Sequence, residues 1–457
     1  MRVSRLSRHA LAAGLAILPR LAFGQDAPPA EVVPADTAFM LVALALVMLM
    51  TPALAFFYGG LVRAKNALNT MTMSFASLGV VLVAWAVLGY TLAFGPGNAV
   101  VGDFSMVLLR GIGLEAKGTI PHLLFFGYQG TFVVITAALI SGAVVERMRF
   151  PAYLLFITLW SLVVYAPVAH WVWGGGWLSG LGALDFAGGA VVHVNAAAAA
   201  LVAALVVGPR RDYGRRAMLP HHVPFVLLGA GLLWFGWFGF NGGSALGATG
   251  LAAQASVNTF LAPAATLVVW MLLDLKRTGT VTAVGVATGL VVGLVAVTPA
   301  AGFVSPMGAL ALGAVAAFPS YFAILLRTRT RLDDSLDVVA AHGVGGVVGA
   351  LLTGVLADPA WGGQAGLLTG DAARVGVQAL SVAAVALYSG LVSFGLLKLI
   401  GFVTPLRATD KMERVGIDLA DHGEEAYTHG EGAVLVHPDE TPVFAAAPVP
   451  AASPSLA

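Results

Sequence analysis

Two histidines set in long apolar stretches are the residues of this sequence best suited to chemistry. His193 lies eight residues after Asp185, and His342 lies eight residues after Asp334. On a helix that rises about 1.5 Å per residue, each histidine would lie about 12 Å deeper than its acid. An ionisable group at membrane depth is costly and is a functional-site hypothesis by default. We therefore predict that the two histidines share one site.

A pair of buried neutral imidazoles can do more than pack. One ring nitrogen donates and another accepts, so the two rings satisfy each other inside an apolar wall, and the same pair can pass a proton. The alternative is that each histidine only fills space in a helix bundle. The matched acid-to-histidine spacing, which occurs twice, favours the functional interpretation.

Trp173 and Asp185 precede His193 and are expected near the mouth of the site. The indole face of Trp173 could attract a cation, an interaction worth about 0.5–2 kcal/mol depending on desolvation. Asp185 begins a helix, where a carboxylate accepts hydrogen bonds from free backbone N–H groups. We prefer this capping role for Asp185 over direct coordination of a cation.

Composition places these residues in an integral membrane protein. The 457 residues are 58% hydrophobic and only 10% charged, whereas soluble proteins carry about 25% charged residues. The net charge of +1, without a basic patch, gives no case for a nucleic-acid partner. Without cysteine, disulfides, thiolate nucleophiles and iron–sulfur clusters are excluded. We expect no cofactor, no metal site and no enzyme, because the helices lack HExxH, GxSxG and paired catalytic acids.

Eleven hydrophobic runs predict spanning helices, because most are near or above the roughly 20 residues that a span needs. They cover residues 38–62, 70–95, 122–146, 150–170, 186–208, 222–246, 252–274, 281–300, 303–326, 336–357 and 376–404. Before them, residues 1–24 combine three arginines with a short apolar stretch and predict a cleaved signal peptide. A first spanning helix is the alternative, but an apolar run of about nine residues is too short for one.

Basic residues orient these runs. They concentrate in alternate loops, at Arg63, Lys65, Arg147, Arg149, Arg210, Arg211, Arg215, Arg216, Lys276, Arg277, Arg327, Arg329 and Arg331. The other loops hold only Arg110, Lys117 and Arg374. The positive-inside rule makes the first set cytoplasmic, with the N-terminus outside and the C-terminus inside.

The histidine segments begin the fifth and tenth predicted helices, which divides the chain into two five-helix halves and one extra helix. An odd number of spans per half forces the halves to be inverted relative to each other, with the substrate path at their interface. The sequence thus predicts an all-α polytopic membrane protein with eleven transmembrane helices.

Four motifs occur in consistent order and spacing: Asp185-Phe-Ala-Gly-Gly189, Val192-His193-Val194-Asn195, Trp237-Phe-Gly-Phe-Asn241 and His342-Gly-Val-Gly345. They resemble the ammonium transporter (Amt/Mep/Rh) family, in its bacterial Amt branch, from about residue 36 to 427. The resemblance implies a membrane domain over 36–404 and a homotrimer whose subunits each hold a pore. It also implies a multi-pass protein of the bacterial cytoplasmic (inner) membrane, in contact with lipid.

The resemblance further implies roles for single residues. It makes His193 and His342 the twin pore histidines, Trp173, Ser244 and Tyr128 the outer ammonium-recruitment site, and Phe132 and Phe240 a stacked gate beneath that site. Tyr128 stands where the family pattern usually has phenylalanine. The phenol keeps the π-face and adds a hydroxyl.

Desolvation narrows what such a path can conduct. Moving a bare ion into low dielectric costs tens of kcal/mol, whereas removing a proton from ammonium near neutral pH costs on the order of two pK units at about 1.36 kcal/mol each. We expect ammonium to lose its proton near the gate and to pass as ammonia along the histidines. The route of the proton stays open. An ammonium sensor that uses the same pore is the alternative function.

The chain changes character after Pro405, and residues 405–457 predict a cytoplasmic, partly disordered tail. Residues 416–418 and 422–427 resemble the family's regulatory tail, which implies docking on a neighbouring subunit and a response to PII-type signalling proteins. Asp418, His422 and Glu424 belong to a segment without an apolar core, so the tail is expected to dock against cytoplasmic loops such as Arg210 to Arg216, a contact that opposite charges favour.

Overall fold

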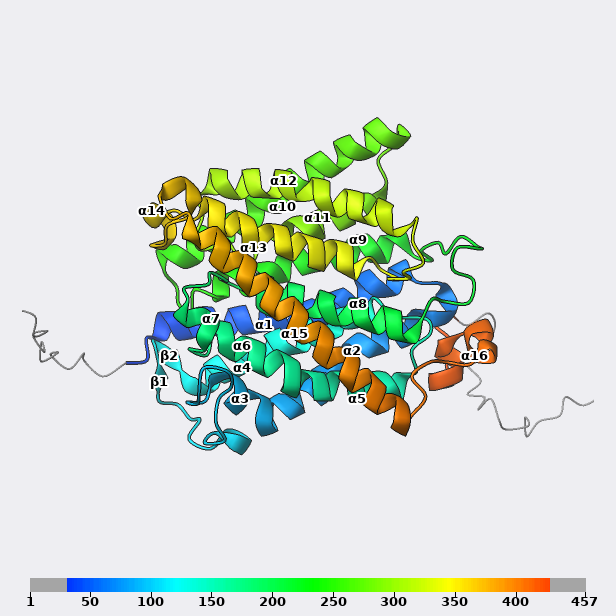
Figure 1. The fold of residues 1–457 in the computed structure, drawn as a ribbon, viewed down its shortest axis with the longest axis horizontal. Helices are drawn as coiled ribbons and strands as arrows, with labels where there is room; N and C mark the ends of the chain where they lie inside the picture. The colour runs from blue at the N-terminus through cyan, green and yellow to red at the C-terminus, as the bar shows by residue number, and fades with distance from the viewer. Residues whose placement is uncertain (1–30, 428–457) are drawn as a thin grey trace, which may run out of the picture.

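Helices dominate the computed structural model, which describes residues 31–427 (Figure 1). The α-helices are α1 (Pro34–Leu61), α2 (Ala67–Ala84), α3 (Tyr90–Phe94), α4 (His122–Ser141), α5 (Phe150–Trp160), α6 (Ala166–Val172), α7 (Trp177–Gly180), α8 (Asn195–Val207), α9 (Val223–Trp237), α10 (Gly250–Thr278), α11 (Ala283–Val297), α12 (Pro306–Arg327), α13 (Gly345–Leu356), α14 (Pro359–Gly362), α15 (Ala373–Val403) and α16 (Asp410–Val415). Strands β1 (Ala116–Lys117) and β2 (Ile120–Pro121) pair antiparallel, with Lys117 opposite Ile120. The predicted signal peptide and residues 428–457 of the tail lie outside the described residues.

All eleven predicted spans are helical. Ten of them are long and apolar enough to cross a membrane, and the remaining one, α11, is a shorter apolar helix. Their lengths follow from the hydrophobic runs, since a helix of about 20 apolar residues spans the hydrocarbon core. The protein is therefore an all-α, multi-pass membrane protein, which confirms the predicted fold class.

Five spans contain a π-helical turn that the hydrophobic pattern does not predict. These turns are η2 (Trp85–Gly89), η4 (Ser161–Tyr165), η5 (Gly189–Val194), η6 (Phe238–Gly242) and η7 (Val339–Val344). Insertions of this kind inside α-helices frequently mark functional sites. Here η5 and η7 hold the two histidines, and η6 holds Phe240.

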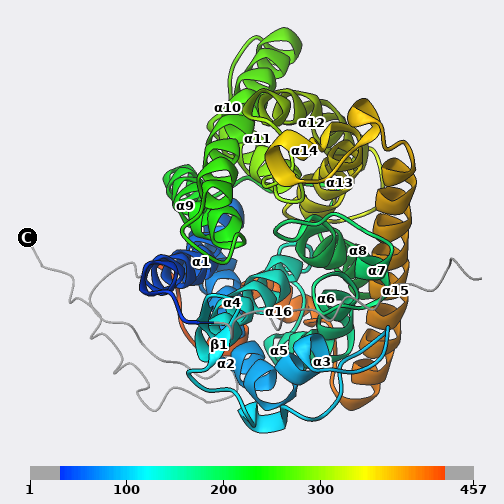
Figure 2. The same ribbon diagram turned by 90° about the vertical axis from the view of Figure 1, so that its left-hand side faces the viewer.

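The helices form two groups with the histidine segments between them. Helices α1 to α8 make up the first group and α9 to α13 the second, as the view along the bundle shows (Figure 2). Helix α1 packs on α9, and η5 packs on η7 and α13, so the two groups meet there. Helix α15 crosses one side of the bundle diagonally (Figure 1) and contacts α5, α8 and α13.

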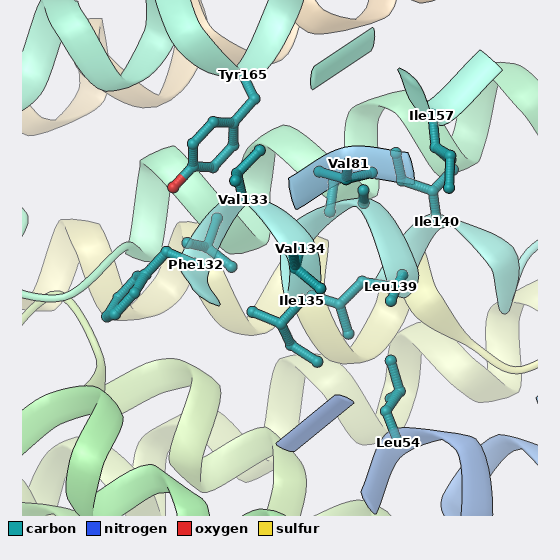
Figure 3. Close-up of a cluster of buried hydrophobic side chains, with 14 of the residues drawn as sticks. Leu54, Val81, Phe132, Val133, Val134, Ile135, Leu139, Ile140, Ile157 and Tyr165 are labelled. Carbon is teal, nitrogen blue, oxygen red and sulfur yellow. The ribbon is translucent and has the colours of Figure 1, made fainter. Parts of the chain in front are cut away.

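Helix α4 is the central helix of the first group. Most of its most apolar stretch is buried, as expected for a helix that is hydrophobic all round. Figure 3 shows its side chains packed against Leu54 of α1, Val81 of α2 and Ile157 of α5. This packing fixes the position of Phe132, which projects from the same helix.

Glycines let α11 lie close to α10. Gly285, Gly289 and Gly293 repeat every four residues, and a Cβ on Gly293 would lie only 2.5 Å from the Cα of Pro263. Small residues at this spacing allow helices in a membrane to approach each other.

The end of the bundle that carries the basic residues is here named the inner face, and the opposite end is the outer face. A buried cluster of charged side chains joins four loops at the inner face. Glu146 lies 2.8 Å from Arg63 and 3.0 Å from Arg210. Arg210 also makes two hydrogen bonds of 2.9 Å to the carboxylate of Asp333. Burial opposes ionisation, but the arginines outweigh it and hold the pKa of Glu146 and of Asp333 below their usual values.

The described part of the tail docks on the inner face of its own chain, against several of the loops that carry basic residues and mostly outside the loop 210–216. Asp418 accepts hydrogen bonds from the backbone N–H groups of Leu68 and Asn69, at 3.0 and 2.7 Å. His422 lies 2.9 Å from the side-chain amide of Asn69. Asp418 therefore lies at the start of α2, where free N–H groups attract a carboxylate as arginines do.

The basic loop nevertheless contributes one contact to the tail. The backbone N–H of Arg211 donates to the carboxylate of Glu413 in α16, at 3.0 Å. Lys65 adds two hydrogen bonds from its ammonium group to the carbonyls of Glu413 and Arg414. Arg149 also forms an ion pair of 2.9 Å with Asp421. The tail is thus attached by this ion pair and by hydrogen bonds between charged side chains and backbone groups.

Candidate pore and its histidine pair

His193 and His342 meet between the two helix groups. Their Nδ1 atoms are 3.2 Å apart, and their ring centroids are 5.3 Å apart with an interplanar angle of 26°. Only 1% and 4% of the two residues is exposed. Since a ring nitrogen donates only when it carries hydrogen, one Nδ1 must be protonated and the other must accept. The structure therefore brings together the two residues that the sequence paired.

Two neighbours hold the pair in place. Trp237 of α9 stacks on His193, with centroids 5.6 Å apart, and its indole N–H donates to Thr298 at 2.9 Å. Gly346 lies on the other side, where a Cβ would come within 3.2 Å of the Cβ of His193. Trp237 received no individual role from the sequence, although it belongs to one of the recognised motifs and lies three residues before Phe240.

The histidines border a narrow apolar lumen of about 10 Å³. Its wall is otherwise hydrophobic, made by Met50, Leu54, Phe57, Ile135, Leu139, Val192, Leu233, Trp237, Phe240 and Val291. The Nε2 atom of His193 is buried without a hydrogen-bond partner among the described residues. Buried polar atoms normally have partners, so this nitrogen can serve a small polar molecule in the lumen.

Phe132 and Phe240 lie on the outer side of the histidine pair. Their rings stack with centroids 4.2 Å apart at 18°, and Phe240 lies 6.1 Å from the ring of His193. Both phenylalanines are buried. A stacked pair of this kind leaves no room for a hydrated ion to pass while the rings stay together.

The three predicted recruitment residues lie beside the stacked phenylalanines: Tyr128 and Trp173 contact Phe132, and Ser244 contacts Phe240. Phe132 lies edge-on to Tyr128 at 5.0 Å and to Trp173 at 5.9 Å. The Tyr128 hydroxyl lies 2.9 Å from the carbonyl of Gly239 and 3.4 Å from the hydroxyl of Ser244. The additional hydroxyl of Tyr128 is thus bound to the backbone of η6.

Asp185 holds the start of η5. Its carboxylate accepts four backbone hydrogen bonds, from Gly188, Gly189, Ala190 and Val191, at 2.5–3.0 Å. Its own carbonyl accepts the indole N–H of Trp173 at 2.9 Å. This is the geometry of a helix cap, and it leaves no carboxylate oxygen free for a cation.

A second cavity, here named the inner vestibule, lies between His342 and the inner face. It has a volume of about 190 Å³ and a polar wall that includes Tyr58, Thr288, Arg327, Ser335 and Asp337. Arg327 and Asp337 form an ion pair of 2.5 Å in this wall. Among residues 31–427, no group of three or more His, Asp or Glu side chains is placed to hold a metal ion.

Comparison with known proteins agrees with this geometry. The profile of the Ammonium Transporter Family matches residues 38–427. An ammonium transporter of Aquifex aeolicus is 49% identical over 397 residues, which cover 86% of this chain and 93% of that protein. The crystal structure of Candida albicans Mep2 superposes with a TM-score of 0.79 at 37% identity, covering 83% of this chain and 87% of that one.

A solved structure described as a sensor Amt protein is similar as well, with a TM-score of 0.80 at 27% identity over 85% of this chain and 98% of that one. The match of the family profile covers nearly the whole described chain, including both histidines, the gate and the docked tail. The chain belongs to the ammonium transporter family.

Proposed function

We propose that this ammonium transporter binds ammonium at the outer face beside Trp173, Tyr128 and Ser244, removes its proton near the Phe132–Phe240 gate and conducts ammonia through the apolar lumen. The proton passes separately along His193 and His342. The observation that carries the proposal is the contact between two buried imidazoles at the wall of a lumen that is otherwise apolar.

The apolar wall supports the neutral form of the substrate. Placing an unpaired ion in such surroundings costs tens of kcal/mol, whereas a neutral molecule avoids this cost. Ammonia can also accept or donate a hydrogen bond at the free Nε2 of His193. Potassium and sodium have no proton to lose, so the same wall rejects them.

The aromatic side chains support cation binding outside the gate. Trp173 is partly exposed, and its indole N–H is already used by the Asp185 carbonyl. The ring face therefore remains for a cation, with an attraction of about 0.5–2 kcal/mol. The hydroxyl of Ser244 can add a hydrogen bond.

We further propose that the membrane domain, residues 36–404, works as a homotrimer in the bacterial inner membrane, with its inner face in the cytoplasm. The basic loops support this orientation. The tail, residues 405–457, would regulate transport and answer to a PII-type partner. The contacts of Asp418 and Glu413 on the inner face support a regulatory position.

Flux measurements separate this function from a sensor that binds ammonium without conducting it. Purified protein in liposomes would receive an ammonium pulse, and accumulation inside the vesicles would be measured. We expect saturable accumulation above empty liposomes and a large loss with His193→Ala. Binding of ammonium without any accumulation would instead support the sensor.

A further inference from the structure

The two acids that precede the pore histidines are alike in sequence and different in structure. All four hydrogen bonds to the Asp185 carboxylate come from backbone N–H groups. Asp334 accepts only one bond from Val339, at 2.7 Å, through Oδ2. Its Oδ1 atom is buried and has no partner in the described part of the chain. The inner acid therefore retains a carboxylate oxygen that can exchange a proton.

Neighbouring acids have arginine partners, but Asp334 does not. Asp333 binds Arg210, and Asp337 binds Arg327 at 2.5 Å. Within residues 31–427, no basic side chain forms an ion pair with Asp334, although it is fully buried. An ionised carboxylate without a partner is unfavourable in such a place.

Arg147 is a buried basic neighbour of Asp334, but it cannot serve as its partner. Its five N–H donors have five acceptors, which are the carbonyls of Ala143, Val145, Gly208 and Asp333 and the hydroxyl of Ser335. A guanidinium has five N–H donors and no more. Arg147 therefore has no N–H group left to form an ion pair with the carboxylate of Asp334.

Asp334 itself is buried and does not line the inner vestibule, but the segment that it begins connects the vestibule to His342. The three residues that follow it, Ser335 to Asp337, line the inner vestibule. Its carboxylate holds the N–H of Val339, which is three residues before His342 and so about 4.5 Å along the helix axis. The vestibule has a volume of about 190 Å³ and a polar wall that includes His342, so it has room for water beside this segment.

Asp337 shapes this segment. Its φ of 59° lies in the left-handed region, which is uncommon and strained for a residue other than glycine. The ion pair with Arg327 holds Asp337 in that conformation. The turn keeps Asp337 directed at Arg327 and leaves Asp334 alone at the start of η7.

We propose that Asp334 is the proton-transfer group of the inner half of the pore, a role that rests on the proton relay of the proposed function. The carboxylate takes the proton that leaves His342 and becomes the neutral acid. The acid then gives that proton to ammonia in the vestibule, which becomes ammonium as the carboxylate is restored. Each cycle moves one proton, and no other reactant is needed.

The groups that face Asp334 agree with this exchange. They are Tyr58 on α1, Arg147 before α5, Arg327 on α12 and Asp337 on its own segment. Burial, followed by the charge of Asp337, raises the pKa of Asp334 to about 7. A carboxyl group that titrates near neutral pH can both accept and donate a proton in the cytoplasmic range.

The test is the ammonium-evoked current of the protein in liposomes, recorded while the pH on the inner side is varied around 7. Asp334→Asn keeps the size of the side chain and an oxygen for the Val339 N–H, but it cannot carry a proton. We expect its current to fall about tenfold or more and to lose its dependence on inner pH. Asp333→Asn is the matched control for the pH profile. It weakens the ion pair with Arg210 and should lower stability, but the current that the assembled protein carries should keep the pH profile of the natural protein.

Asp334→Glu covers the case in which the asparagine variant fails to assemble. It keeps the acid at a changed position, so current should remain with a shifted dependence on inner pH. A natural pH profile and amplitude in either variant would overturn the proposal for Asp334. Absence of current in the natural protein would instead overturn the relay of the proposed function.

Discussion

His193 and His342 share one hydrogen bond and should behave as one unit at the level of single residues. Replacing either with alanine removes the partner of the other, so we predict that ammonium-evoked current falls about tenfold or more in each variant. The double variant should be no worse than additive, since the two act together. Size-exclusion chromatography checks that assembly is intact. Natural current in His193→Ala would contradict the relay.

Asp185 tests whether geometry or charge matters at the start of η5. An amide still accepts two of the four backbone hydrogen bonds, so Asp185→Asn should keep part of the transport. Asp185→Ala keeps none and should lose about 1 kcal/mol or more of stability along with most transport. Thermal unfolding and ammonium flux measure the two effects. Equal loss of flux in both variants would show that the negative charge itself is required.

The hydroxyl of Tyr128 is predicted to matter little for substrate binding. It is engaged with the carbonyls of Gly239 and Phe240, so Tyr128→Phe removes a structural bond and leaves the π-face in place. We expect apparent ammonium affinity within about twofold of the natural protein and a stability loss of about 1 kcal/mol. A large change in affinity would place the hydroxyl in the binding site.

Residue types and spacing allowed the histidine pair to be predicted, because repeated Asp-to-His segments in two inverted halves must converge. Two contacts could not be predicted in this way: the stacking of Trp237 on His193 and the hydrogen bonds of the Tyr128 hydroxyl to the backbone of η6. They depend on side-chain rotamers and on the π turn η6, which hydrophobic periodicity does not encode.

The buried charge cluster acts between elements, since Arg210 connects the loops after α4, α8 and α12. Arg210→Met removes one of the two arginine partners of Glu146 and the arginine that binds both carboxylate oxygens of Asp333. Breaking a buried pair in this way costs about 3–5 kcal/mol, so thermal stability at neutral pH should fall markedly.

The pH dependence of this loss has a defined sign. The folded-state pKa of Glu146 and of Asp333 is lowered, so the stabilisation they provide is present above their usual values of 4.5 and 3.8 and is lost as pH falls below them. The difference between Arg210→Met and the natural protein should therefore shrink in acid. A difference that is equal at neutral and acid pH, measured by unfolding in detergent, would contradict this account.

The tail is a second test at the level of elements. Deleting residues 414–457 removes the carboxylate of Asp418 from the start of α2, so we predict lower transport and a weaker response to a PII-type partner without loss of membrane insertion. A contact regulates only if its free energy differs between conducting and non-conducting states. Unchanged transport and unchanged partner binding would make the tail a passive extension.

Hydropathy was sufficient to predict the spans, because the bilayer imposes their length. The docking site of the tail could not be predicted from charge alone. The segment of residues 416–422 binds free N–H groups of α2 and the side chain of Asn66. Because backbone donors are not charged residues, the distribution of charges along the sequence does not reveal them.

The whole molecule combines two inverted halves so that one histidine comes from each. The histidine contact needs both halves, since η5 supplies His193 and η7 supplies His342. The proposed gate likewise draws Phe132 from α4 and Phe240 from η6. In the proposed mechanism, ammonium is deprotonated before passage, while its proton follows the histidines.

The most direct measurement of this claim is the current that the purified protein carries in liposomes under ammonium, potassium and proton gradients. We predict a saturable current with ammonium, none with potassium, and loss of the ammonium current in His193→Ala. A potassium current of similar size would contradict deprotonation as the source of selectivity. Ammonia accumulation without any current would contradict the passage of the proton along the histidine pair.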